Sequence, residues 1–469
     1  MKRLICTLIG SVIFCGFYSY SAVQELSKEA TISLLIASPN PDQLVSSYGH
    51  SLLRVKDPKL NIDYVFNYGT FDRTLSGFET FMGIATGKLK YEIWVIPYTE
   101  YYETTLKENR KLVEYTFNFS AEEKNTIWHN LISIVKNKNQ YLFDFFSQNC
   151  TTFVRDLITY NLGKQILLPS DLGQKTYHDI NIKYTKNKLW YVFLVDLISG
   201  MNLDKKAPSY ESLYEPKELV NAWSKSFILE DNGEKKPIFA SASLLINGKN
   251  LINETKTPFI ISPLFFSLVL LVLVLSLSII EWETGNYYRW FDILIFGFTG
   301  FLGLLFYLFK FACPRWYFLM DWKMFWLHPF HLLAVFFLIK SLNKPLKIYH
   351  YINSAILAFL IVGVFFLPQH FNPAIILLII CLFIRSIFFV LRERIPNKKK
   401  TIRKLFILKS SSHNQSSVKL LKSKEFLENI KFPLLSNKTA FCFNMSFVSN
   451  STNFLSYKRA KIDFLSGVI

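Results

Sequence analysis

Hydrophobic and polar positions divide the chain into regions of different periodicity. Near the start, the apolar run Leu4–Phe17 follows two basic residues and precedes small residues around Ser21 and Ala22. This order is typical of a secretory signal, so we predict a signal peptide over residues 1–22. An uncleaved first membrane helix is the alternative.

Residues 23–257 mix strand patterns with helical patterns. The predicted strands are rich in β-branched and aromatic residues and are bounded by Gly, Pro or Asp. They are Ala30–Ala37, Ser51–Val55, Tyr64–Tyr68 and Tyr91–Ile96. A capping-box sequence at Ser120–Glu123 precedes apolar residues at helical spacing, and Thr151–Tyr160 has the same spacing. We therefore expect an exported α+β domain.

Five longer apolar segments follow, and each suits a helix that crosses about 30 Å of hydrocarbon. They lie at about 258–280, 291–311, 322–341, 352–368 and 373–391. We expect an all-α membrane domain of five helices over 258–391. Five crossings after an exported domain place the C-terminus in the cytoplasm. The basic run Arg392–Lys404 then satisfies the positive-inside rule.

Composition agrees with a membrane protein, because 51% of residues are hydrophobic and only 19% are charged. The net charge of +18 would suggest a nucleic-acid partner. However, residues 398–469 alone carry 14 lysines and arginines against 3 acidic residues. A basic cytoplasmic tail over 392–469, partly disordered, explains most of the charge, and we expect no nucleic-acid partner.

The cysteine count points to chemistry. Cys150 is the only one of six cysteines that falls within 23–257. Structural cysteines of exported proteins normally come in pairs, so a lone cysteine is either buried and inert or a working thiol. Cys150 opens a predicted helix, where unpaired N–H groups and the helix dipole favour the thiolate. The same N–H groups could stabilise an oxyanion.

A cysteine nucleophile needs a base, and the exported region offers His50, His129 and His178. His129 lies within the helix predicted after the capping box, and His178 lies in a polar, lysine-rich stretch. His50 follows a glycine and begins a predicted strand, which can aim an imidazole across a cleft. We therefore predict a pair of Cys150 and His50.

A third group often orients such a histidine. The next predicted strand offers Asp63 and Asn67, which lie four residues apart and so share a face. We predict Asp63 in this role, with a turn-forming aspartate at a strand start as the alternative.

Several polar residues lie in or beside the apolar segments. His328 and His331 share one face of the third segment. They either form a functional site within the membrane or contact lipid headgroups at its outer side. His370 and Asn372 fall in the outer connection that faces the exported domain, where they either contact a substrate or form a solvated turn. Arg385 near the inner end of the last segment is explained by snorkelling. The exported region has no metal-ligand spacing and no cofactor fingerprint, so we expect neither metal nor cofactor.

The order of a histidine strand, a polar residue and an Asn-Cys helix start resembles the circularly permuted branch of the NlpC/papain-like superfamily. That branch includes the lecithin retinol acyltransferase-like enzymes, which move acyl groups from phospholipids through a cysteine thioester. The resemblance implies a permuted papain-like fold for residues 23–257.

A closer resemblance is to the Lnb family of bacterial lipoprotein N-acyltransferases, which pair such a periplasmic domain with five membrane helices. It covers about residues 25–391, and the basic tail is not expected of the family. The matching motifs are Tyr48–Val55, Asp63, Asn67–Asp72, Asn149–Thr152, Arg155-Asp156, Trp322–Pro329 and Gln369–Pro373.

The resemblance implies an inner-membrane enzyme whose catalytic domain lies in the periplasm. It would move an acyl chain from a phospholipid to the α-amine of a diacylglyceryl-cysteine lipoprotein. Cys150 would form the thioester, with His50 as base and Asp63 beside it. The residues implied in substrate binding are Tyr48, Asn67, Tyr68, Asn149, Arg155, His370 and Asn372.

Two other functions remain open at this level. A cysteine peptidase or amidase that cuts cell-wall peptide would use the same pair, but it would need only a single anchor. A membrane scaffold in which Cys150 is merely buried would need no pair at all.

Overall fold

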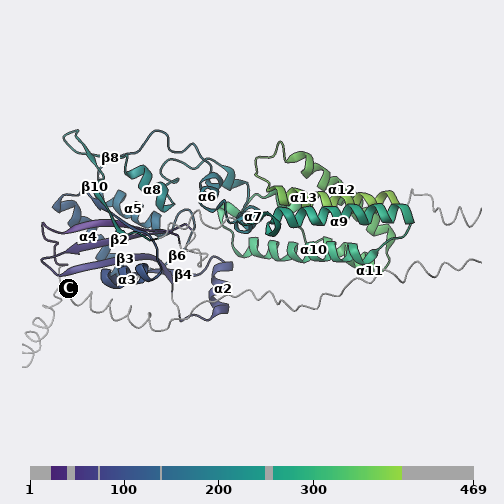
Figure 1. The fold of residues 1–469 in the computed structure, drawn as a ribbon, viewed down its shortest axis with the longest axis horizontal. Helices are drawn as coiled ribbons and strands as arrows, with labels where there is room; N and C mark the ends of the chain where they lie inside the picture. The colour runs from purple at the N-terminus through teal and green to yellow at the C-terminus, as the bar shows by residue number, and fades with distance from the viewer. Residues whose placement is uncertain (1–22, 40–47, 72–73, 138–139, 249–256, 393–469) are drawn as a thin grey trace, which may run out of the picture.

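The chain folds into an α+β domain and a helical bundle that lie end to end (Figure 1). This computed structural model describes residues 23–39, 48–71, 74–137, 140–248 and 257–392. The predicted signal peptide and residues 393–469 of the predicted tail lie outside the described residues.

A seven-stranded antiparallel sheet forms the centre of the α+β domain, with strand order β10-β5-β1-β2-β3-β4-β6. The four predicted strands are confirmed within a few residues. The strands are β1 (Thr31–Ala37), β2 (His50–Asp57), β3 (Ile62–Phe71), β4 (Lys90–Pro97), β5 (Leu112–Phe117), β6 (Tyr141–Leu142) and β10 (Phe239–Ile246).

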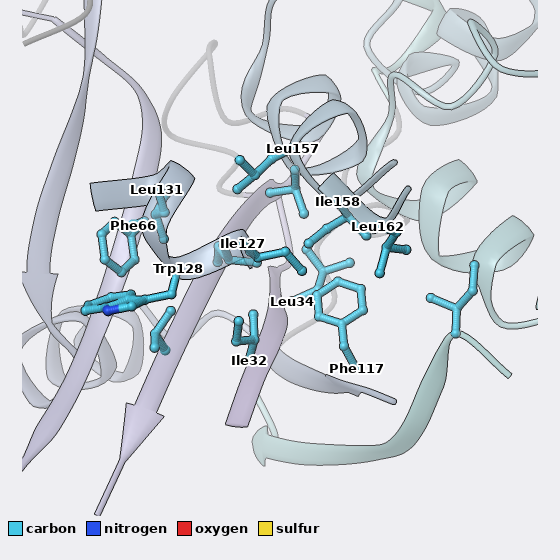
Figure 2. Packing of buried hydrophobic residues seen from close by; sticks show 14 of the residues in the cluster. Ile32, Leu34, Phe66, Phe117, Ile127, Trp128, Leu131, Leu157, Ile158 and Leu162 are labelled. Atoms are coloured by element: carbon cyan, nitrogen blue, oxygen red, sulfur yellow. The ribbon is translucent and has the colours of Figure 1, made fainter. Parts of the chain in front are cut away.

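Both faces of the sheet are covered, because successive side chains of a strand point to opposite faces. On one face, Leu34 packs with residues of α4 (Ala121–Lys136) and α5 (Cys150–Leu162), as Figure 2 shows. On the other face, Leu35 packs beside tyrosines of α3 (Tyr98–Lys107). The predicted capping box at Ser120 is present at the start of α4. The core thereby fixes α5 against the centre of the sheet.

A small sheet and three helices complete the α+β domain. The sheet contains β7 (Ile166–Leu167), β8 (Phe227–Leu229) and β9 (Lys235–Pro237), and the helices are α6 (Tyr177–Thr185), α7 (Leu189–Ile198) and α8 (Pro216–Trp223). In Figure 1, α6 and α7 lie between the main sheet and the bundle. Apolar residues of α7, including Phe193 and Leu197, pack into the bundle core. The two parts of the chain therefore share a packed junction.

Among the described residues, four helices are long and apolar enough to cross a membrane. They are α9 (Pro263–Thr284), α10 (Arg289–Ala312), α12 (Asn343–Gly363) and α13 (Pro373–Leu391). The predicted third span over 322–341 is wrong as a continuous helix. That segment begins with the 3-10 turn η5 (Trp322–Phe325), passes Pro329, and becomes helical only in α11 (His331–Ile339). Proline lacks the backbone N–H that would extend a helix through this point.

Glycines of α10 explain how the broken segment fits beside that helix. A Cβ atom at Gly303 would lie 2.6 Å from the backbone carbon of His328. A Cβ atom at Gly300 would lie 2.9 Å from the backbone nitrogen of Leu332. Small residues let helices approach closely within a membrane. The backbone of the broken segment is therefore seated directly against α10.

Arg385 does not snorkel, contrary to the sequence expectation. Its side chain is fully buried between helices and ion-pairs with Asp292 of α10 and Glu281 of α9, each at 2.6 Å. It also donates to the hydroxyl of Ser278 at 2.9 Å. The guanidinium of α13 thus joins three helices, because its two acidic partners lie on α9 and α10 and hold it inside the bundle.

The short helix α2 (Gly77–Ala85) lies crosswise to the bundle at its junction end (Figure 1). Leu75, Phe78 and Met82 recur at intervals of three and four residues and are exposed, with Phe78 at 73%. Just after α2, the carbonyl of Gly87 accepts a hydrogen bond from Arg315, in the connection that follows α10. The apolar side of α2 is therefore held at the level where the bundle meets the α+β domain.

We expect Gly303→Ala to lower the thermal stability of the detergent-solubilised protein, because the added methyl group meets the backbone of His328. Overpacking of this kind costs about 1–3 kcal/mol. Gly297→Ala is the matched control, because a Cβ atom there meets its nearest neighbour only at 3.8 Å. Equal melting temperatures for the two variants would contradict the close approach.

Candidate active site

Asn149 and Cys150 together form the start of α5. The side-chain oxygen of Asn149, Oδ1, accepts from the backbone N–H groups of Thr151 and Thr152, at 2.8 and 2.9 Å. Its amide nitrogen donates to the carbonyls of Phe145 and Tyr214. Cys150 is then the first helical residue, at the positive end of the helix dipole. The cap occupies the N–H groups of Thr151 and Thr152. The backbone N–H of Cys150 is therefore the donor in this first turn that could bind an oxyanion.

His50 is the first residue of β2 and lies beside Cys150. Its Nε2 donates to the side-chain oxygen of Asn67 in β3, with a separation of 2.7 Å. The imidazole also interacts electrostatically with the Cys150 thiol. Because Nε2 is engaged with an acceptor, Nδ1 is the nitrogen available to take the thiol proton. Cysteine, histidine and asparagine therefore form one series of interacting side chains, in which Asn67 is hydrogen-bonded to His50 and His50 is coupled to Cys150.

Two local features bring the strand and the helix into register. Ser51 and Thr151, the residues that follow His50 and Cys150, share a buried hydrogen bond between hydroxyls at 3.0 Å. A bulge in β3 falls at Gly69, whose φ of +116° suits glycine. A Cβ atom at Gly69 would lie 3.7 Å from the His50 ring and 3.8 Å from Cβ of Cys150. Strand, bulge and helix thus enclose the pair.

The pair favours the thiolate and imidazolium forms. Burial by itself raises the pKa of Cys150, but the charge of His50 and its hydrogen bond lower that pKa by more, to about 7. For His50, burial lowers the pKa, and the thiolate and Asn67 raise it to a net value above the ordinary one. A nucleophile that ionises near neutral pH is what thiol catalysis requires.

Asp63 does not reach His50, so the structure does not place it in the predicted orienting role. In the β2–β3 register Asp63 lies opposite Lys56, six residues along the strand from His50. That is roughly 20 Å at the rise of a β-strand. Asp63 instead forms a two-point ion pair with Arg54, with both N–O distances 2.7 Å. Asn67, expected to bind substrate, is the residue that contacts the histidine.

Four other residues expected to bind substrate have structural contacts around the pair. Asn149 caps α5, as described above. The Tyr48 hydroxyl donates to the Asn181 side chain at 2.8 Å. The ring of Tyr68 is stacked between those of Tyr141 and Phe153. Arg155 ion-pairs with Asp156 and donates to the carbonyl of Tyr210. These four side chains therefore all have protein partners in the structure.

The last two expected residues, His370 and Asn372, lie at the junction with the bundle. The backbone N–H of His370 donates to Asp204, and the side chain of Asn372 donates to Asp196. The structure therefore places them in a second cluster, between α7 and the start of α13.

Glu215 was missed by the sequence reasoning. It is 3% exposed, and burial, followed by the charge of Cys150, raises its pKa well above the ordinary value. A carboxyl group that stays protonated is thereby held in the electrostatic field of the thiolate. In the sequence, Glu215 precedes Pro216, which begins α8. A residue followed by proline is an ordinary helix start, so nothing in the sequence indicates a functional carboxyl group here.

The fold and the site define a class: a multi-pass membrane protein whose α+β domain carries a cysteine–histidine pair at a helix start. Comparison with protein families makes this specific. The Lnb N-terminal periplasmic domain matches residues 20–181, and the Lnb transmembrane domain matches residues 253–395. The chain belongs to the Lnb family, as a multi-pass inner-membrane protein with a periplasmic domain. No curated protein and no solved structure matches it.

We expect alkylation of Cys150 by iodoacetamide to show a midpoint near pH 7, because the thiolate is the reactive form. His50→Ala removes the imidazolium, so the midpoint should rise to roughly 8.5 or above. Mass spectrometry of the Cys150 peptide after short exposures at each pH measures this. His129→Ala, at an exposed site on α4, is the control. A His50→Ala profile identical to the parent would show that the pair is not coupled.

Asn67→Ala and Asp63→Ala should separate the two candidate partners of His50. Loss of the Asn67 acceptor destabilises the charged ring by about 1.5–3 kcal/mol, so the alkylation midpoint of Cys150 rises. Asp63→Ala should leave the midpoint unchanged and lower the melting temperature, because buried Arg54 loses an ion pair. A midpoint shift in Asp63→Ala as large as that in Asn67→Ala would argue against the assignment of Asn67.

Proposed function

We propose that the protein is a membrane-bound apolipoprotein N-acyltransferase. It would take an acyl chain from a phospholipid and transfer it to the α-amine of a diacylglyceryl-cysteine lipoprotein. The observation that carries the proposal is the interacting series Cys150–His50–Asn67 at a helix start, in a domain packed onto a membrane bundle. Membership of the Lnb family supports the same reaction class.

In the first half-reaction, Nδ1 of His50 holds the thiol proton while Sγ of Cys150 attacks the ester carbonyl of the phospholipid. A carbon–sulfur bond forms, and the ester carbon–oxygen bond then breaks. The proton passes from His50 to the departing oxygen, which leaves as a lysophospholipid. The product is an acyl thioester on Cys150. The Cys150 N–H would stabilise the oxyanion of the tetrahedral intermediate.

In the second half-reaction, the lipoprotein amine attacks the thioester carbonyl. His50 takes a proton from the amine, the carbon–sulfur bond breaks, and the proton returns to sulfur. The products are an amide and the free thiol. Because an amide is more stable than a thioester, the transfer needs neither ATP nor a cofactor.

Features outside the pair support lipid substrates over a cell-wall peptide. The exposed apolar side of α2 lies crosswise at the junction end of the bundle, as an interfacial helix does. Buried Arg110 lies just before β5, at the end of the sheet that carries His50, and it interacts electrostatically with His50. Its Nη1 pairs with Glu108 at 3.3 Å, and its buried Nη2 has no hydrogen-bond partner among the described residues. We propose that this guanidinium contributes positive charge toward the lipid phosphate. A peptidase with the same pair would need none of these features.

The direct test is the intact mass of one abundant lipoprotein's N-terminal peptide in strains with the parent protein, no protein, or Cys150→Ala. We expect only the parent to add one acyl chain as an amide, because the thioester needs the Cys150 sulfur. Unchanged lipoprotein mass in all three strains, with accumulating muropeptides, would instead indicate the amidase.

A variant of α2 tests the lipid side of the proposal. Phe78→Asp places a charge where α2 would meet the bilayer, so acylation should fall while alkylation of Cys150 stays unchanged. Leu106→Asp is the matched control, because Leu106 is an exposed apolar residue on α3. Equal acylation by the two variants would show that α2 does not help lipid substrates reach the site.

A further inference from the structure

A second group of ionisable side chains lies where the α+β domain meets the bundle. His178 of α6, Asp196 of α7 and His370, just before α13, present ligand atoms within 4.8 Å of one another. In the described part of the chain, this is the group of histidine, cysteine and acidic residues with metal-binding spacing. The proposed acyl transfer uses none of the three.

We propose that these three residues bind one divalent transition-metal ion, with Zn²⁺ as the best match. Two imidazoles and one carboxylate are a common protein donor set for zinc, completed by water at a fourth position. A set with no thiolate and only one carboxylate fits Ca²⁺ and Mg²⁺ poorly, because these ions prefer oxygen ligands.

The surroundings prepare the group for a cation. Asp196 is 2% exposed, and its Oδ2 accepts from Nδ2 of Asn372 at 2.8 Å. That contact leaves Oδ1 directed at Nε2 of His178, 2.7 Å away. Hydrogen bonds to the free oxygen of a ligating carboxylate are typical of metal sites. His370 is exposed, so its side gives an ion and its water ligand access from solvent.

Only small movements are needed to accept the ion. Tetrahedral coordination at about 2.0–2.1 Å separates ligand atoms by roughly 3.4 Å. His178 and Asp196 must therefore part by some tenths of an ångström. The ring of His370 lies 4.5 Å from that of His178, centroid to centroid, and its exposure leaves it free to rotate. The backbone of His370 is already held by Asp204 at 2.9 Å.

A competing cation near the cluster is the ammonium group of Lys323, whose charge acts on Asp196 and His370. It is buried and has its own partners, the carbonyl of Ser199 at 2.7 Å and Asp321 at 3.4 Å. Asp321 is also shared with Lys310, at 2.9 Å. The hydrogen bond of the Lys323 ammonium group nevertheless goes to Ser199, so Oδ1 of Asp196 stays with His178. A bound ion would link α6 and α7 to the segment that leads into α13, and so would fasten the α+β domain to the bundle.

The test uses the full chain, solubilised in detergent and carrying an affinity tag without histidine. The background is Cys150→Ala, because the thiolate of the first site could itself bind zinc. After treatment with a chelator, Zn²⁺ is titrated by calorimetry, and Co²⁺ is used as a spectroscopic probe of tetrahedral coordination. We expect one Zn²⁺ per chain. That site should be lost in His370→Ala and in Asp196→Asn, and Asn372→Ala should weaken it about 10- to 100-fold.

His129→Ala, an exposed histidine on α4, is the matched control and should bind like the background protein. Melting curves without metal show whether each variant folds, and the exposed position of His370 makes His370→Ala the decisive variant. A protein that binds no stoichiometric Zn²⁺, or a His370→Ala variant that binds as tightly as the control, would overturn the proposal. The cluster would then be a hydrogen-bonded group only. Acylation is not a readout here, so this result is independent of the proposed function.

Discussion

The start of α5 is the constraint on which the candidate site depends. One side chain, Asn149, closes the helix end and at the same time ties it to two other segments of the α+β domain. The hydrogen bond between Ser51 and Thr151 then fixes the distance between strand and helix. The hydrogen bonds of Asn149 and the Ser51–Thr151 hydrogen bond are buried, so water does not compete for these groups. Loss of either would leave buried polar groups without partners. The buried contacts of these neighbouring residues therefore hold the Cys150 thiol beside the His50 imidazole.

A second set of buried polar contacts determines where that site lies relative to the membrane. Lys310 at the end of α10 ion-pairs with Asp321 at 2.9 Å and donates to the carbonyl of Ile198. Gln369 donates to Asp321 and to the carbonyl of Ser199. The end of α7 is thereby held by side chains of the bundle. Buried charges with several partners favour one arrangement over its alternatives, so the junction is expected to be rigid.

Much of the fold and the central pair of the site could be predicted from the sequence, because these depend on local signals. Cys150 and His50 were identifiable from a lone exported cysteine at a helix start and a histidine at a strand start. The choice between Asp63 and Asn67 was not, since both lie on one face and only the strand register decides which one is near His50. The broken third segment was hidden because its apolar average outweighs Lys323 and Pro329. His178, Asp196 and His370 come together only through tertiary structure.

The ion pairs of Arg385 have a consequence for how the protein enters the membrane. An arginine in an isolated membrane helix is costly during insertion by the translocon, by up to about 2.5–3.5 kcal/mol at the helix centre and by less toward its ends. Its partners Glu281 and Asp292 lie on α9 and α10, which are synthesised before α13. The last helix can therefore settle without an unpaired charge only after the first two have been retained nearby. Assembly of the bundle is thus cooperative, because α9 and α10 must stay close to the insertion site until α13 has been synthesised.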